Sequence, residues 1–161
     1  MKKIMILLLA TVLTACSTLT PAEKAERKAK TAQAVEKALT ERRYKVDISM
    51  MLTNRGTAVN VTSNYSLEVK GDTLVSYLPY FGRAYQMPYG GGKGLNFTAP
   101  ISDYHAEKDH RGTYQININV KNEEDDYSYH LEVFDNGSTT IHLTTRQRDP
   151  ISYSGDLDLR E

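Results

Sequence analysis

The sequence predicts a mainly β protein in which an N-terminal helix precedes a curved antiparallel sheet of seven to eight strands, arranged as a sandwich or an open barrel. From Tyr44 onward, apolar residues recur at every second position, which is typical of strands with one buried face. The segments between them are tight turns with no room for crossover helices, so neighbouring strands must run antiparallel. The chain has 11 tyrosines, all at Tyr44 or beyond, and tyrosine is enriched in strands.

Alternating apolar residues set the expected strands, and short turns separate them. Tyr44 and Val46 begin the first strand, and Asn54-Arg55-Gly56 forms the turn that follows it. Asp135-Asn136-Gly137 is a strong hairpin signal later in the chain. In order, the expected strands cover residues 44–52, 59–69, 73–78, 114–120, 127–133, 141–143 and 151–159. An irregular segment, residues 77–97, overlaps the end of the third strand and interrupts the series.

The N-terminus has the pattern of a lipoprotein signal peptide. Two lysines precede a short apolar run, Ile4–Leu13, which is too short to span a bilayer but suits a signal sequence. The run ends in Leu13-Thr14-Ala15-Cys16, which resembles the lipobox of bacterial lipoproteins, in which the cysteine is acylated. Cys16 is the only cysteine in the chain, so no intramolecular disulfide is possible. We expect lipidation and membrane anchoring at Cys16.

These patterns predict three segments: a signal peptide (1–15), a lipidated N-terminus with a helical spacer (16–43) and a single β-rich domain (44–161). The helix is expected to begin at a Thr20-Pro21 cap and to end near residue 43. It is either a solvated spacer or a lipid-binding helix. In well-studied lipoprotein sorting systems, retention in the inner membrane resembles a rule that requires aspartate directly after the acylated cysteine. Here Ser17 follows the cysteine instead, which favours the outer membrane, facing the periplasm. Export to the cell surface remains an alternative.

The formal net charge is zero, but its distribution is uneven. Residues 17–43 carry seven basic and four acidic side chains, whereas the expected β domain is acidic. Nucleic-acid binding requires a basic surface, so the composition argues against it. We expect a membrane contact through the lipid, and a glycan, a lipid or an envelope protein as the partner of the domain.

Aromatic residues crowd into the irregular middle segment and give the candidate ligand-binding residues. They are followed by the glycine-rich stretch Gly90–Gly94. In one interpretation the aromatic rings and an arginine line a groove for a glycan, lipid or peptide. In the other, the rings are core residues and the glycines form a wide turn. The candidates are Tyr80, Phe81, Arg83, Tyr85 and Tyr89.

The same segment, together with 135–138 and 148–155, resembles the domain-of-unknown-function 4251 family of exported bacterial proteins, many of them lipoproteins. The aromatic-Gly-Arg motif at 81–83, followed by the glycine run, is the most specific part of the resemblance. The resemblance runs from about Thr20 to the C-terminus. It implies export and a mostly β domain, and it transfers no catalytic residues.

No catalytic or cofactor site is predicted. His105, Glu107, Asp109 and His110 are close in sequence but lack the spacing of a zinc site, and a polar loop is expected there. The acidic stretch Glu123–Asp126 lacks a calcium-loop pattern and is expected to be a charged turn. His130 and His142 are expected to face outward. The sequence therefore favours a non-enzymatic binding or interaction module of the cell envelope, and a small envelope hydrolase acting on a glycan is the alternative.

Overall fold

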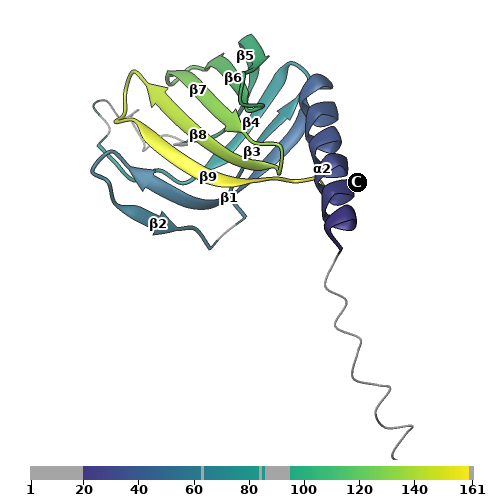
Figure 1. Ribbon diagram of the computed structural model, residues 1–161. Helices are drawn as coiled ribbons and strands as arrows, with labels where there is room; N and C mark the ends of the chain where they lie inside the picture. The colour runs from purple at the N-terminus through teal and green to yellow at the C-terminus, as the bar shows by residue number, and fades with distance from the viewer. Residues whose placement is uncertain (1–19, 63, 84, 86–94, 160–161) are drawn as a thin grey trace, which may run out of the picture.

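The computed structural model describes residues 20–62, 64–83, 85 and 95–159, and over these residues the chain is mainly β (Figure 1). One helix is followed by nine strands in the described part, which confirms the predicted fold class. The elements are α2 (Pro21–Thr40), β1 (Arg43–Thr53), β2 (Ala58–Asn60), β3 (Ser66–Lys70), β4 (Thr73–Leu78), β5 (Leu95–Lys108), β6 (Tyr114–Lys121), β7 (Asp126–Val133), β8 (Ser138–Thr145) and β9 (Ile151–Leu157).

Eight of the strands form a closed antiparallel barrel, because the first strand pairs with the last. From β3 to β9 each strand pairs with the next one in the chain, and β1 pairs with both β3 and β9. In Figure 1 the yellow β9 lies beside the blue β1. The β1–β9 register runs from Val46–Leu157 to Thr53–Ile151 and shifts once at a bulge after Ile48. The predicted curvature therefore continues to full closure.

The ninth strand, β2, lies on the same edge of β1 as β3. The sequence predicts one strand over 59–69, whereas the structure has two short strands with different registers against β1. Hydrogen bonds continue on both sides of the break: Val61 N–H donates to Ser49 O (2.9 Å) and Ile48 N–H donates to Tyr65 O (2.9 Å). The interruption is therefore a local irregularity in one long hairpin with β1.

Alternate residues of each strand fill the barrel interior, as the period of two predicts. The buried residues form one cluster, to which every barrel strand contributes. One polar group inside is fully bonded: Ser76 Oγ donates to Leu95 O (2.7 Å) and accepts from Tyr129 Oη (3.2 Å). The largest fully buried side chains include Tyr127, Tyr129, Tyr153, Met51, Leu67, Leu74, Ile116, Ile118, Leu131 and Ile141.

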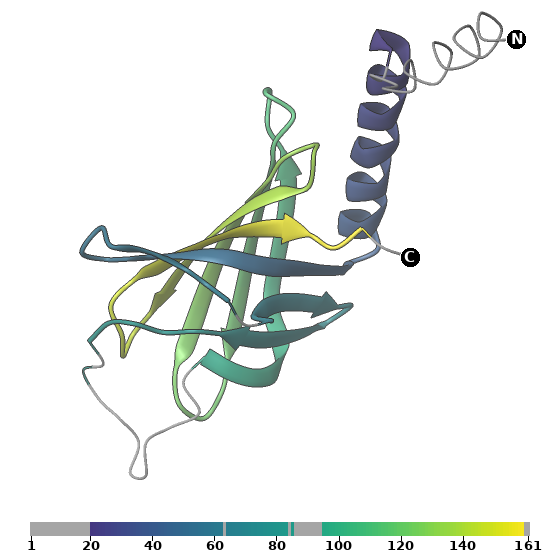
Figure 2. The ribbon, with the colours of Figure 1, turned by 90° about the horizontal axis from the view of Figure 1, so that it is seen from below.

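Helix α2 packs against one end of the barrel with its C-terminal half only. Val35 and Leu39 are buried, whereas residues 21–30 are exposed, and Figure 2 shows the helix projecting from the barrel. Its predicted cap is confirmed, since Glu23 N–H donates to Thr20 Oγ1 (3.3 Å) and Thr20 N–H donates to Glu23 Oε2 (2.7 Å). In the described part of the chain, no helix combines the length and the apolar character needed to span a membrane.

The helix ends three residues earlier than the sequence predicts. It stops at Thr40, and Arg42 adopts a left-handed backbone with φ of 51°. This residue turns the chain into β1 while its carbonyl accepts a hydrogen bond from Gly71 N–H (2.8 Å). Because arginine is compatible with helix by propensity, the sequence alone gives no stop signal there.

Replacing Gly155 with alanine should destabilise the barrel at its closure. Gly155 pairs with Ile48 at the β1–β9 bulge, and a Cβ at residue 155 would overlap the Asp47 backbone carbonyl. We expect Gly155→Ala to lower the free energy of unfolding by about 3 kcal/mol, measured by urea unfolding. Gly56→Ala is the control: it meets no neighbour within 4 Å but has φ of 78°, so its cost should be about 1 kcal/mol. Equal costs would contradict this role of Gly155.

Candidate functional site

The candidate site lies at the end of the barrel opposite α2. Strands β1, β4 and β8 end there, and the segments that follow them are the β1–β2 turn, residues 79–83 with 85, and residues 146–150. Figure 2 shows that the segment after β4 leaves the barrel on the side away from the helix. The barrel fixes the start of this segment, because the buried Tyr153 donates from Oη to Pro79 O (2.7 Å).

Two segments far apart in sequence pair at this end, and we call them together the distal lip (residues 80–83, 85 and 147–149). Tyr85 N–H donates to Gln147 O (2.7 Å), and Asp149 N–H donates to Arg83 O (3.1 Å). Two backbone hydrogen bonds in this arrangement form a short antiparallel bridge. The bridge fixes the backbone of the lip at Arg83, Tyr85, Gln147 and Asp149.

The predicted aromatic residues divide into one structural residue and two exposed rings. Tyr80 is half-buried, and its Oη lies within hydrogen-bond distance of Arg83 O (2.8 Å) and Asp149 O (3.3 Å), so it supports the lip. Phe81 and Tyr85, by contrast, are 66% and 65% exposed. Such exposure excludes a core role for these two rings. Tyr89 and the glycine run lie outside the described residues.

Asp149 is the electrostatic centre of the lip. Its carboxylate accepts hydrogen bonds from Tyr85 Oη and from Arg83 N–H (3.4 Å to Oδ2). The hydrogen bond from Tyr85 is the largest cause that lowers the pKa of Asp149, and the positive charges of Arg83 and Arg55 lower it further. The same carboxylate raises the pKa of the Tyr85 hydroxyl. Asp149 is therefore ionised and Tyr85 protonated at neutral pH.

Arg148 points the opposite way, into the barrel mouth. Its side chain is only 8% exposed, its guanidinium lies 5.8 Å from the ring centre of Tyr80, and it pairs with Glu124 at 3.8 Å. A buried guanidinium with an acidic partner and an aromatic neighbour is a stabilising arrangement. Arg148 thus closes the mouth of the barrel, while its neighbour Asp149 serves the lip.

A hollow of about 280 Å³ lies between the β1–β2 turn and the lip. Its position follows from the barrel, because the turn after β1 stands next to the segments that flank β9. Its lining residues include two arginines, one aspartate and Phe81, whose ring is exposed. The hollow is lined by Thr53, Asn54, Arg55, Phe81, Gly82, Arg83 and Asp149. We call it the lip hollow.

The sequence identified only part of this site. Phe81 and Arg83 were predicted as ligand-binding residues, and the structure brings them together with Arg55 and Asp149. Arg55 was seen only as part of a turn, and Asp149 only within a motif of the family resemblance. Asp149 is 66 residues from Arg83 in the chain, and no local pattern links such distant positions.

The acidic turn has a structural role in the described chain. Asp125 is buried, and its carboxylate accepts hydrogen bonds from Asp126 N–H (2.8 Å), Arg146 N–H (3.1 Å) and Gln147 N–H (3.1 Å). Asn122 Oδ1 caps the same turn. Because the carboxylate oxygens of Asp125 already bind backbone N–H groups, it stabilises the loop that carries the lip. The charged-turn interpretation of Glu123–Asp126 is thereby supported.

The histidines lie outside the barrel. His105 and Glu107 are in strand β5 and not in a polar loop, so that part of the expectation was wrong; the strand has no apolar alternation there because both faces are exposed. His105 Nε2 lies 3.6 Å from Glu107. His130 and His142 face outward as predicted, bonded to Asn117 (2.8 Å) and Ser152 (2.9 Å). Among the described residues, no group of three or more potential ligands could hold a metal ion.

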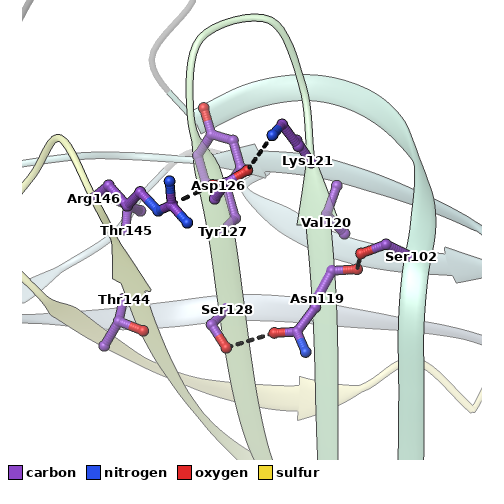
Figure 3. Close-up of a pocket in the computed structure, with 10 residues that line it drawn as sticks. All are labelled: Ser102, Asn119, Val120, Lys121, Asp126, Tyr127, Ser128, Thr144, Thr145 and Arg146. Carbon is purple, nitrogen blue, oxygen red and sulfur yellow. Dashed lines mark hydrogen bonds and ion pairs between the residues drawn. The ribbon is translucent and has the colours of Figure 1, made fainter.

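A second hollow, of about 450 Å³, lies on the outer wall of β5–β8 (Figure 3). Its polar side chains point toward one another. Ser128 Oγ donates to Asn119 Oδ1 (2.7 Å), and Asp126 pairs with Arg146 (3.0 Å) and Lys121 (3.6 Å). Mutually bonded groups offer a ligand less than unpaired ones, so the lip hollow is the better candidate.

Comparisons with known proteins agree with this fold. The sequence model of a family described as "Domain of unknown function (DUF4251)" matches residues 26–157. The crystal structure of a DUF4251 family protein from Bacteroides eggerthii DSM 20697 is similar, with a TM-score of 0.62 and 18% sequence identity, over 80% of this chain and 87% of that one. At this identity the likeness shows the fold alone. No curated protein matches the chain.

Removing the Asp125 carboxylate should loosen the loop that carries the lip. Asp125→Ala leaves the N–H groups of Arg146 and Gln147 without their acceptor, and we expect a loss of about 2 kcal/mol in unfolding free energy. Glu123→Ala, in the same turn but exposed, should change it by less than about 0.5 kcal/mol. Thermal unfolding should show the same difference in stability between wild type and Asp125→Ala in calcium as in EDTA. A difference only with calcium would identify a metal ligand instead.

The pKa of Asp149 should depend on the Tyr85 hydroxyl. Since the hydrogen bond from Tyr85 lowers this pKa most, Tyr85→Phe should raise it toward the usual aspartate value. A carboxyl NMR titration measures it, with Tyr77→Phe as the exposed control. Because the folded pKa is depressed, this contribution to lip stability is present above the unfolded pKa and is lost as the pH falls through the folded one. An unchanged Asp149 pKa in Tyr85→Phe would contradict the assignment.

Proposed function

Because this chain belongs to the DUF4251 family, a domain of unknown function, we propose its role from its own residues: it is a bacterial lipoprotein that binds a ligand at the distal lip. The membrane anchor is the lipid on Cys16, in the outer membrane and facing the periplasm or the cell surface. The domain is a non-enzymatic binding or interaction module of the envelope. The observation that carries the proposal is the pair of exposed aromatic rings held on a fixed backbone.

The anchor is supported by the sequence pattern before the helix. Lys2 and Lys3, the apolar run and the lipobox-like Leu13–Cys16 occur in the order of a lipoprotein signal. Acyl chains contribute about 0.8 kcal/mol of membrane binding per buried CH₂ group, so several chains give stable anchoring. A palmitate-labelling experiment tests it: label should incorporate into the chain and disappear with Cys16→Ser.

The position of the lip suits a tethered binding protein. Helix α2 has 20 residues, a length of about 30 Å, and its exposed N-terminal half follows directly after the proposed anchor. The lip lies at the other end of the barrel (Figure 2). A tether at Cys16 would thus leave the lip hollow facing away from the membrane.

The rings at the lip are the type of group that binding sites expose. Contiguous exposed apolar groups are typical of interaction sites, and both exposed rings belong to the distal lip. Phe81 and Tyr85 are the two most exposed of the large hydrophobic residues in the described chain. The bridge fixes the backbone at Arg83 and Tyr85, and Asp149 holds the Tyr85 hydroxyl, before a ligand arrives. Such preorganisation lowers the entropy cost of binding.

The alternative, a glycan hydrolase, has less support. Glycosidases commonly use two carboxyl groups on either side of the scissile bond. The described residues that line the lip hollow include one carboxylate, Asp149. Asp125 and Glu124 lie nearby in the fold, but the former binds backbone N–H groups and the latter pairs with Arg148.

Phe81→Ala should abolish ligand binding without unfolding the domain. Phe81 is mostly exposed, so its removal should change the stability little. We would purify the intact chain from the envelope of its host in detergent and compare native with denaturing mass spectra. Wild type should carry additional mass that is lost on denaturation, and Phe81→Ala should not.

Phe134→Ala is the matched control, since Phe134 is exposed (43%) at the opposite end of β7 from the acidic turn. It should retain the additional mass. Two outcomes would refute the binding role of the lip: no additional mass on the wild type, or equal loss in both variants.

A further inference from the structure

The lip hollow is lined by two arginines that share a single carboxylate, that of Asp149. Arg55 and Arg83 both line it, and neither guanidinium forms a hydrogen bond or an ion pair within the described residues. Elsewhere, Arg148 pairs with Glu124 and Arg146 pairs with Asp126. Two arginines that share one carboxylate leave a positive charge for an anionic ligand, and the guanidinium group is well suited to bind a carboxylate.

The hollow is locally positive although the domain is acidic. Its charged lining residues are Arg55, Arg83 and Asp149, which gives one excess positive charge. Asp149 carries one negative charge against two positive ones, so it cannot neutralise both arginines. An anion is therefore favoured in this hollow.

The other lining groups suit a sugar. The exposed ring of Phe81 offers a flat apolar face. Thr53 and Asn54 bring a hydroxyl and an amide to the same hollow, and such groups pair with sugar hydroxyls. At about 30 Å³ per water molecule, a hollow of about 280 Å³ accommodates one ring-sized group. These features together exceed what a simple anion such as phosphate requires.

We propose that the lip hollow binds an acidic sugar, with Arg55 and Arg83 holding its carboxylate and the ring of Phe81 covering its apolar face. This inference rests on the binding function proposed above and names its ligand class. Asp149 positions Arg83 through its backbone N–H and accepts from a hydroxyl of the sugar. A neutral sugar lacks the group that both arginines require.

The test is calorimetric titration of the full chain in detergent with trigalacturonate and with neutral α-1,4-linked galactotriose. The two probes differ in having a carboxylate or a hydroxymethyl group on each ring. We expect binding of trigalacturonate only, weakened by added salt. Arg55→Gln and Arg83→Gln should each weaken it at least about tenfold. Arg27→Gln, the same change on the exposed half of α2, should leave it unchanged.

Equal binding of both trisaccharides, no binding of either, or wild-type affinity in both lip variants would overturn the inference. Thermal unfolding of each variant shows whether a loss of affinity reflects a loss of folding. A Phe81-dependent ligand in the mass spectra, combined with no binding of trigalacturonate, would refute the acidic-sugar assignment and leave the binding function standing. Failure of both experiments would refute both.

Discussion

The pairing of β1 with β9 is the contact on which the rest of the structure depends. The other barrel pairings from β3 to β9 join strands that are consecutive in the chain. The β1–β3 pairing spans only β2 and its turns. The β1–β9 ladder joins the first and last strands, and it requires Gly155 where the two backbones approach closely. Without it the sheet would have two long open edges. The buried cluster could then not be enclosed from all sides.

Closure also explains where the candidate site forms. The barrel places the turn after β1 next to the segment before β9, and the segment after β4 folds back to the same place. Arg55, Arg83 and Asp149 thus converge from three regions of the chain. Two buried side chains hold the loop that carries the lip. Arg148 does so through its ion pair with Glu124 and the aromatic residues at the barrel mouth, and Asp125 does so through hydrogen bonds from backbone N–H groups. The lip is a product of the barrel rather than of any one loop.

The sequence predicted the local features of the fold well. Alternation at a period of two located β1, β4, β6, β7 and β9, and the Thr20-Pro21 cap located the start of α2, because both signals arise from neighbouring residues. Strand β5 was missed altogether, since its first half lies in the irregular segment and its second half, exposed on both faces, has no apolar alternation. The burial of Arg148 was missed because charged residues are rarely buried without partners, and its partner Glu124 lies on another hairpin.

In the site, too, features that arise from neighbouring residues were predicted and features that depend on distant residues were not. Exposed aromatic residues in an irregular, glycine-rich segment were a usable signal, and Phe81, Arg83 and Tyr85 do lie together at the lip. Whether each ring was core or surface could not be predicted, since Tyr80 and Phe81 are adjacent and similar in type but point to different environments. That outcome is decided by carbonyl groups at Arg83 and Asp149, which only the long-range bridge brings near the Tyr80 hydroxyl.

The free strand edges have a consequence for how copies of this protein can meet. Strand β5 pairs with β4 through residues 95–100 and with β6 through residues 101–108, so residues 102–108 have a strand partner on one side only. A long free edge can recruit a strand from another chain into a shared sheet. Here a bulge between Ile101 and Asp103 interrupts the edge, and the charged Glu107 and Lys108 lie along it. Both features oppose edge-to-edge pairing between copies of this chain.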